Sequence, residues 1–229
     1  CHAAARQLGW QPHAQRQAFQ AALTMNLSIL DLQARLADQV SPLTAKQREV
    51  IHGHPIRSAE MLSAVGIADT DWLEAVRTHH EVPGGSGYPC GMTDVSELAE
   101  LLRFADVYTA QLSRRANRSA MSPRQAGRRL HQMSASSPLT LALIKAFGVY
   151  PPGSMVRLAS GELGVVVRSG EKAHLPLVAT LTNAAGESTP HSVLRDSAND
   201  AHAVVALLSP QAMPLWLSDE RLAELIGSA

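Results

Sequence analysis

Two adjacent histidines, His79-His80, lead into a glycine-rich turn that ends in Gly87-Tyr88-Pro89, and Asp106 follows inside an apolar run. Histidine and carboxylate side chains are the usual ligands of hard and borderline divalent metals. Glycine lets the backbone approach a ligand closely because it has no Cβ atom. Tyr88 offers an aromatic ring on which a nucleobase could stack. These residue types predict a metal site beside a loop that could contact a nucleotide.

A further histidine, His54, stands directly before Pro55. His52 lies only two residues earlier, and two residues at that spacing on a helix do not share a face. We therefore assign His52 to the surface. A buried, unpaired carboxylate is costly, so Asp106 should be ligated, paired in a salt bridge or held by a hydrogen bond.

A short arginine cluster, residues 114–118, follows the segment that holds Asp106. The planar guanidinium group binds phosphate oxygens in a bidentate manner, which makes this cluster a candidate phosphate site. Arginines at the end of a helix are equally typical of a solvated surface that the helix dipole favours. Both interpretations stay open at this point.

Together these motifs resemble the signature of the HD-GYP family, relatives of the HD phosphohydrolases that are known for hydrolysing cyclic di-GMP. The resemblance covers roughly residues 1–195 and is strongest from His79 to Tyr108. It implies a bundle of helices that directs His and Asp side chains at metals, which polarise a phosphoryl group and activate water. Carried over position by position, it implies metal ligands at His54, His79, His80 and Asp106, and nucleotide contacts at Gly87, Tyr88, Arg115 and Arg118.

The other half of the family signature is missing from this chain. The resemblance places Met25-Asn26 where the family has its His-Asp pair, Ile29 where it has a lysine, and Gly84 where it has an aspartate. An amide is a weaker and neutral ligand, and a thioether suits soft metals rather than Fe, Mn or Mg. These departures predict a degenerate site that hydrolyses its substrate poorly or not at all.

Three functions follow from this pattern. The first is a degenerate HD-GYP domain of bacterial signal transduction that binds cyclic di-GMP or a protein partner without turnover. The alternative is an active metal-dependent phosphodiesterase with a reduced metal site. A third is a homodimerisation module that works beside a sensor. One divalent metal, Fe or Mn, and no metal at all stay open.

Composition excludes several other classes of protein. The chain has 20 Lys and Arg against 20 Asp and Glu, so net charge gives no sign of DNA as a partner. No apolar run approaches the roughly 20 residues that span a bilayer. The two cysteines, Cys1 and Cys90, predict no structural disulfide and fit a cytoplasmic protein. The first residues lack Met and a helix cap, which predicts that further residues precede Cys1.

The pattern of elements predicts a mostly α fold, an HD-domain-like helical bundle with a small C-terminal antiparallel β appendage. Residues 1–150 have helical periodicity, with one uninterrupted stretch over 14–36, helix starts at Thr44, His54, Asp69, Ser96 and Ser122, and Asp106 in the Ser96 helix. Residues 151–229 contain β-like runs at 155–158, 164–168, 177–181 and 203–208, and then a helix over about 218–226. We expect the site in the helical part, and we expect the β part, in which the sequence shows no titratable cluster, to cover the bundle or contact a partner.

Overall fold

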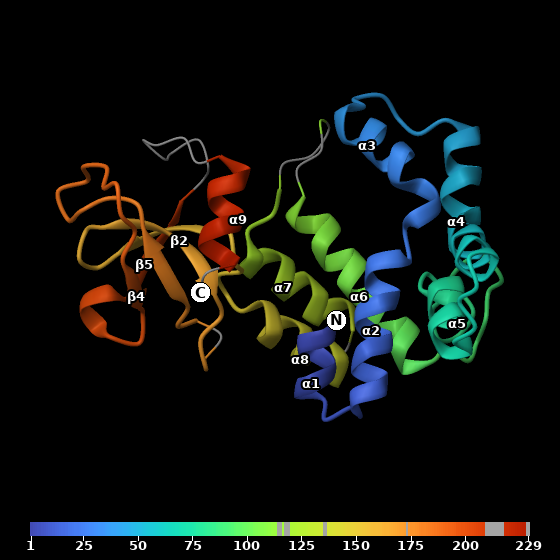
Figure 1. Cartoon of the computed structure of the whole chain (residues 1–229). Helices are drawn as coiled ribbons and strands as arrows, with labels where there is room; N and C mark the ends of the chain where they lie inside the picture. Colours follow the sequence, from blue (N-terminus) through green and yellow to red (C-terminus); the bar gives the residue numbers. More distant parts are fainter. Residues whose placement is uncertain (114–115, 117–119, 135–136, 173, 209–217, 228–229) are drawn as a thin grey trace. The chain divides into compact units, whose positions relative to one another are not determined.

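The computed structural model describes the chain except for residues 114–115, 117–119, 135–136, 173, 209–217 and 228–229 (Figure 1). Internal contacts divide it into two compact units, Cys1–Leu143 and Ile144–Ala229. The first unit is helical and the second is built on a sheet, so the predicted fold class is confirmed. Among the described residues, no helix combines the length and the apolar character that crossing a membrane requires.

The helical unit contains α1 (His2–Gln7), α2 (Pro12–Thr24), the 3-10 helix η1 (Leu27–Ile29), α3 (Leu30–Asp38), α4 (Ala45–Ala64), α5 (Thr70–Thr78), α6 (Glu97–Leu112) and α7 (Pro123–Met133). The boundary between the two units falls within α8 (Pro138–Phe147). Thr44 and Ser122 begin their helices with capping boxes, and the carboxylate of Asp69 accepts the backbone N–H of Trp72. Each satisfies an N–H group that the first turn of a helix leaves without a partner.

The predicted helix start at His54 is wrong, because α4 runs through this position without a break. Pro55 has no N–H, so the carbonyl of Ile51 loses the donor that an α-helix normally supplies. The Nδ1 atom of His54 lies 2.5 Å from that carbonyl oxygen and replaces the missing donor. The proline therefore stays inside the helix, and the carbonyl that it leaves without a backbone donor fixes the histidine ring.

The predicted uninterrupted helix over 14–36 is also wrong, since α2 ends at Thr24 and α3 begins at Leu30. Between them Met25 turns into the hydrophobic core, where it is 6% exposed. The hydroxyl of Ser28 donates to the carbonyl of His54 at 3.0 Å and lies 3.0 Å from the hydroxyl of Ser58. These bonds connect the segment between α2 and α3 to α4, and they outweigh the helical preference of the local sequence.

The core of the helical unit lies where α2, α4, α5 and α6 meet, and Figure 1 shows α4 and α5 side by side. Trp72 packs there against small residues such as Ala21, Ala59 and Ala75. Its indole N–H donates to the hydroxyl of Thr24 at 3.0 Å, which satisfies the one polar group that the ring buries. With few aromatic residues, alanines let the helices approach closely.

The second unit is a five-stranded antiparallel sheet in the order β4-β3-β2-β1-β5. Its strands are β1 (Met155–Leu158), β2 (Leu163–Arg168), β3 (Leu177–Thr180), β4 (Leu194–Asp196) and β5 (Val204–Leu208). The four predicted strands are confirmed, whereas β4 is an addition. One face buries a cluster around Val166, and the other packs Val165 and Val167 against Leu222 of α9 (Asp219–Gly227). Both faces of β2 are buried, as its unbroken apolar run requires.

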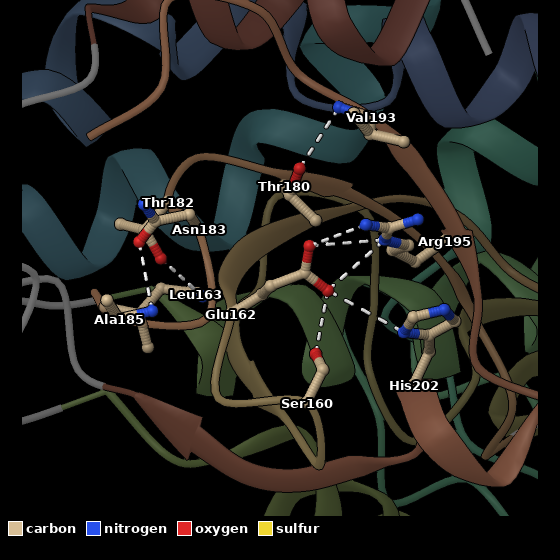
Figure 2. A network of polar contacts seen from close by, with 10 residues as sticks. All are labelled: Ser160, Glu162, Leu163, Thr180, Thr182, Asn183, Ala185, Val193, Arg195 and His202. Carbon is tan, nitrogen blue, oxygen red and sulfur yellow. Dashed lines mark hydrogen bonds and ion pairs between the residues drawn. The ribbon is translucent and has the colours of Figure 1, made fainter. Parts of the chain in front are cut away.

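A polar network ties the β1–β2 turn of this unit to β4 (Figure 2). Glu162 accepts hydrogen bonds from the guanidinium of Arg195, the shortest at 2.8 Å, and from the hydroxyl of Ser160 at 2.7 Å. The ring of His202 lies 3.7 Å from the same carboxylate. The hydrogen bonds from Arg195 lower the pKa of Glu162 below its ordinary value. We assign this network a structural role, since it joins the β1–β2 turn to β4 and to the 3-10 helix η2 (Asp200–His202).

Candidate metal centre

Two buried histidines face each other in the helical unit. His54 comes from α4, and His79 follows the last residue of α5. Their Nε2 atoms are 3.1 Å apart, and both side chains are almost fully buried. His79 directs its Nδ1 atom at the carbonyl of Val76, at 2.7 Å, as His54 does toward Ile51. In each case a carbonyl that the helix leaves free sets the orientation of the ring.

These backbone bonds also decide where the protons are. A carbonyl can only accept, so Nδ1 carries the proton in both rings and each neutral imidazole presents a lone pair at Nε2. Two lone pairs at 3.1 Å repel each other unless a cation lies between or beside them. Burial lowers the pKa of His54 and lowers that of His79 to about 4. Protonation therefore does not relieve the repulsion at neutral pH, and the donor set fits a divalent metal.

His80 completes a group of three potential ligands. Its ring centroid lies 4.2 Å from that of His79 and 5.0 Å from that of His54. One ligand atom from each of the three histidines lies within 4.8 Å of the other two. Burial, and after it the neighbouring charges of His79 and His54, hold the pKa of His80 far below its ordinary value. Neutral imidazoles are the form that binds a metal.

Asp106, the fourth predicted ligand, lies close by but outside this histidine group among the described residues. Its Oδ1 atom accepts a hydrogen bond from the side-chain amide of Asn26 at 3.2 Å. Its charge acts on His54, whose pKa it raises against the larger effect of burial. The structure thus brings Asp106 together with Asn26, the residue that the sequence resemblance predicts at the position of the family's aspartate.

The other three departures from the family pattern occupy ordinary structural positions. Met25 packs with Ala59 and Leu62 in the core, and Ile29 is buried as well. Gly84 has a φ of +95° and open space around its Cα. None of the three presents a group that could replace the ligand or cation of the family.

The glycine-rich loop is held from inside by Glu81, which is fully buried. Its two carboxylate oxygens accept the backbone N–H groups of Cys90 at 2.7 Å and Met92 at 3.0 Å. Gly87 lies so close to residues 80–82 that a Cβ atom there would be 2.4 Å from the nitrogen of Val82. Only glycine fits this approach. The loop is therefore tightly fixed beside the histidines, and its Cys90 is exposed.

Tyr88 lies between two imidazole rings. Its ring stacks on His80 with centroids 4.5 Å apart and on His52 with centroids 4.5 Å apart. Burial, followed by the charge of Asp106, raises the pKa of Tyr88 above its ordinary value. The base-stacking role of Tyr88 stays a prediction, and in this structure its ring already stacks on two imidazoles.

Arg115 and Arg118, the predicted phosphate contacts, lie outside the described residues. A different cation, Arg103 of α6, lies near enough to His80 to lower its pKa. The side chain of Arg103 is 14% exposed, 3.8 Å from Glu100, and its buried Nε atom has no hydrogen-bond partner. An arginine three residues before Asp106 shares its helix face, and this spacing could have identified Arg103 from sequence.

A separate surface cavity of about 500 Å³ lies beside Trp10 in the same unit, with Gln17, Asp71 and Glu97 among its lining residues. It contains none of the histidines and none of the predicted contact residues. The convergence of Nε2 atoms, rather than the size of a hollow, therefore locates the candidate site.

Comparison with known proteins agrees with this geometry. The family model of the HD domain matches residues 1–138. The chain is also similar to a cyclic di-GMP phosphodiesterase from Pseudomonas aeruginosa, with 31% identity over 169 residues. That match covers 72% of this chain and 41% of the relative, so the chain spans less than half of that protein's length. The chain belongs to the HD domain family, and its paired histidines and Gly-Tyr-Pro loop make it an HD-GYP-like member.

Proposed function

We propose that this chain is an HD-type domain of cyclic di-GMP signalling that binds the dinucleotide and hydrolyses it poorly or not at all. The similarity to a cyclic di-GMP phosphodiesterase supports the ligand. The three-histidine group and the Gly-Tyr-Pro loop support a retained binding site. A protein partner, a homodimer and a cytoplasmic location stay predictions.

The hydrogen bond between Asn26 and Asp106 carries the proposal of weak catalysis. A carboxylate can only accept here, so the amide nitrogen of Asn26 must face it and the amide oxygen faces away. The position that resembles the family's metal-bridging aspartate thus presents a donor to Asp106. A donor at this place competes with a metal for the same carboxylate oxygen.

The residues that would hold a single divalent metal are His54, His79 and His80. When bound, such a metal would supply Lewis acidity to a phosphoryl group and to water. The chain's own part is to fix the three imidazoles, through the carbonyls of Ile51 and Val76 and through the ring of Tyr88. Arg103 would add positive charge beside the phosphates.

Restoring the missing ligands tests the proposal. We expect the wild-type chain to hydrolyse cyclic di-GMP near the background rate when Mn or Fe is added. Chromatography of the products measures this rate. Asn26→Asp, and more fully the double change Met25→His with Asn26→Asp, should raise the rate at least about tenfold, because they return the carboxylate and imidazole that a two-metal site needs. The matched control is Gln33→Asp, which adds the same charge at an exposed position of α3.

A wild-type rate well above background that His79→Ala abolishes would contradict this proposal. It would support the second candidate, an active phosphodiesterase with a reduced metal site. The convergence of three neutral histidines favours that candidate. It requires near-stoichiometric metal in protein purified without chelator, and metal-free protein that stays inert after addition of Mn or Fe would end it.

A further inference from the structure

Three aromatic rings form a continuous stack at the candidate site. His80, Tyr88 and His52 follow one another with centroid separations of 4.5 Å at each step. The interplanar angles are 20° between His80 and Tyr88 and 14° between Tyr88 and His52. The rings are therefore nearly parallel, and the stack leads outward from the histidine group.

Both supports of this stack are rigid. Tyr88 belongs to the loop that Glu81 fixes, and its backbone N–H donates to the carbonyl of His80 at 3.2 Å. His52 belongs to α4, two residues before His54, where the helix is continuous. The stack therefore does not depend on a mobile segment.

The two ends of the stack differ. At the inner end, His80 is one of the three potential metal ligands. At the outer end, His52 is exposed, and Tyr88 is its only aromatic-ring contact within the described part of the chain. Since Tyr88 already stacks on two imidazoles and His52 is exposed, the ring that offers a ligand an open face is His52.

We propose that His52 is a base-stacking residue of the ligand site, on whose outer face a purine base of the bound dinucleotide lies. This inference rests on the proposed function, because that function supplies the nucleotide. Every base has a flat π face, and histidine is among the side chains on which unstacked bases lie in complexes. A base on His52 would extend the stack by one ring while the attached phosphates turn toward the histidine group and Arg103.

Calorimetric titration of the full chain with cyclic di-GMP tests the assignment. We expect His52→Ala to weaken binding about 5- to 100-fold, the range that removal of a stacked aromatic side chain causes. His52→Phe keeps a flat ring and should bind within about threefold of wild type. The control is Glu60→Ala, an exposed change further along α4 that should leave affinity unaltered. Metal content and melting temperature are measured for every variant.

Each of the following outcomes would overturn the assignment of His52 as a base-stacking residue. Equal or tighter binding by His52→Ala would mean that the imidazole only covers Tyr88, which the base then reaches. A His52→Phe variant as weak as His52→Ala would mean a hydrogen bond to the ring nitrogens instead of stacking. Loss of metal in parallel with loss of affinity would mean a structural role. Wild-type protein that binds no cyclic di-GMP would overturn the proposed function itself, and with it this inference.

Discussion

The rings of His54 and His79 are oriented by two backbone carbonyls. Proline inside α4 frees the carbonyl of Ile51, and the last turn of α5 leaves that of Val76 without an intrahelical donor. Such a bond on the far nitrogen fixes the tautomer and orientation of a ligand histidine. The orientation that a metal would require of these rings is therefore set by helix geometry.

At the residue scale, the first prediction concerns His79. Replacing it with alanine removes a ligand, so metal affinity should fall by more than the roughly 10- to 100-fold that loss of a ligand's supporting bond costs. Elemental analysis and a Mn titration measure the change, and His174→Ala, at an exposed histidine of the sheet unit, is the control. Equal metal content in both variants would show that His54 and His79 do not share a metal.

The second prediction concerns the stability of metal-free protein between pH 7 and 5. The folded pKa of His79 is about 4, against an ordinary value of 6.5. As pH falls below 6.5 the unfolded chain takes up a proton that the folded chain does not, so the free energy of unfolding decreases and this loss levels off below about 4. The slope is at most about 1.4 kcal/mol per pH unit for this residue.

Urea denaturation in the presence of chelator measures that slope. The His79→Ala variant serves as the reference, because it lacks the titrating ring while all carboxylates remain. A wild-type slope no steeper than that of the variant would contradict the low pKa.

The motifs that carry the family resemblance pointed to the three histidines that the structure brings together. They did not predict the contact between His52 and Tyr88. The argument that His52 and His54 point to different faces of α4 holds, but the ring that meets His52 comes from a loop some 35 residues later. Glu81 was missed for a similar reason, since its partners are backbone N–H groups that carry no sequence signal.

At the scale of elements, the loop of residues 81–92 depends on its glycines to different degrees. An alanine at Gly87 would put its Cβ atom 2.4 to 2.6 Å from backbone atoms of residues 80–82, so the loop would have to open, at a cost of about 3 kcal/mol or more. An alanine at Gly84 meets nothing within 4 Å and carries only the strain of its φ of +95°, about 1–2 kcal/mol.

Chemical denaturation of the two alanine variants checks this order, and metal content reports whether His80 is still held in place. Gly84→Ala should keep its metal and Gly87→Ala should lose affinity. The reverse order would mean that the approach of Gly87 to the backbone is not needed for folding.

Local patterns predicted most elements, because caps such as Thr44, Asp69 and Ser122 act within one turn of the chain. They failed where a side chain, local or distant, replaced a backbone bond of the helix. The carbonyl freed by Pro55 is satisfied by a side chain, and the break before η1 is stabilised by Ser58, 30 residues away. Strand β4 is short and exposed, so it lacks the apolar run that identified the others.

At the scale of the whole molecule, each unit has its own core. Glu162→Ala would leave Arg195 without its carboxylate and should destabilise the sheet unit by about 2 kcal/mol. Hydrogen exchange of the full chain should show lower protection in residues 155–208 and unchanged metal content. Glu171→Ala, at an exposed glutamate of the same unit, is the control. Equal protection in both variants would contradict a stabilising role for the network.

The loop that Glu81 fixes also carries a natural attachment point for a spectroscopic probe. Cys90 is exposed, and Cys1 is the only other cysteine, so a Cys1→Ser chain would present a single thiol. A nitroxide on Cys90 would lie two residues from Tyr88, and Mn²⁺ at the histidine group would shorten its spin relaxation. Metal occupancy and loop motion could then be followed by electron paramagnetic resonance, with no new residue placed near the ligands.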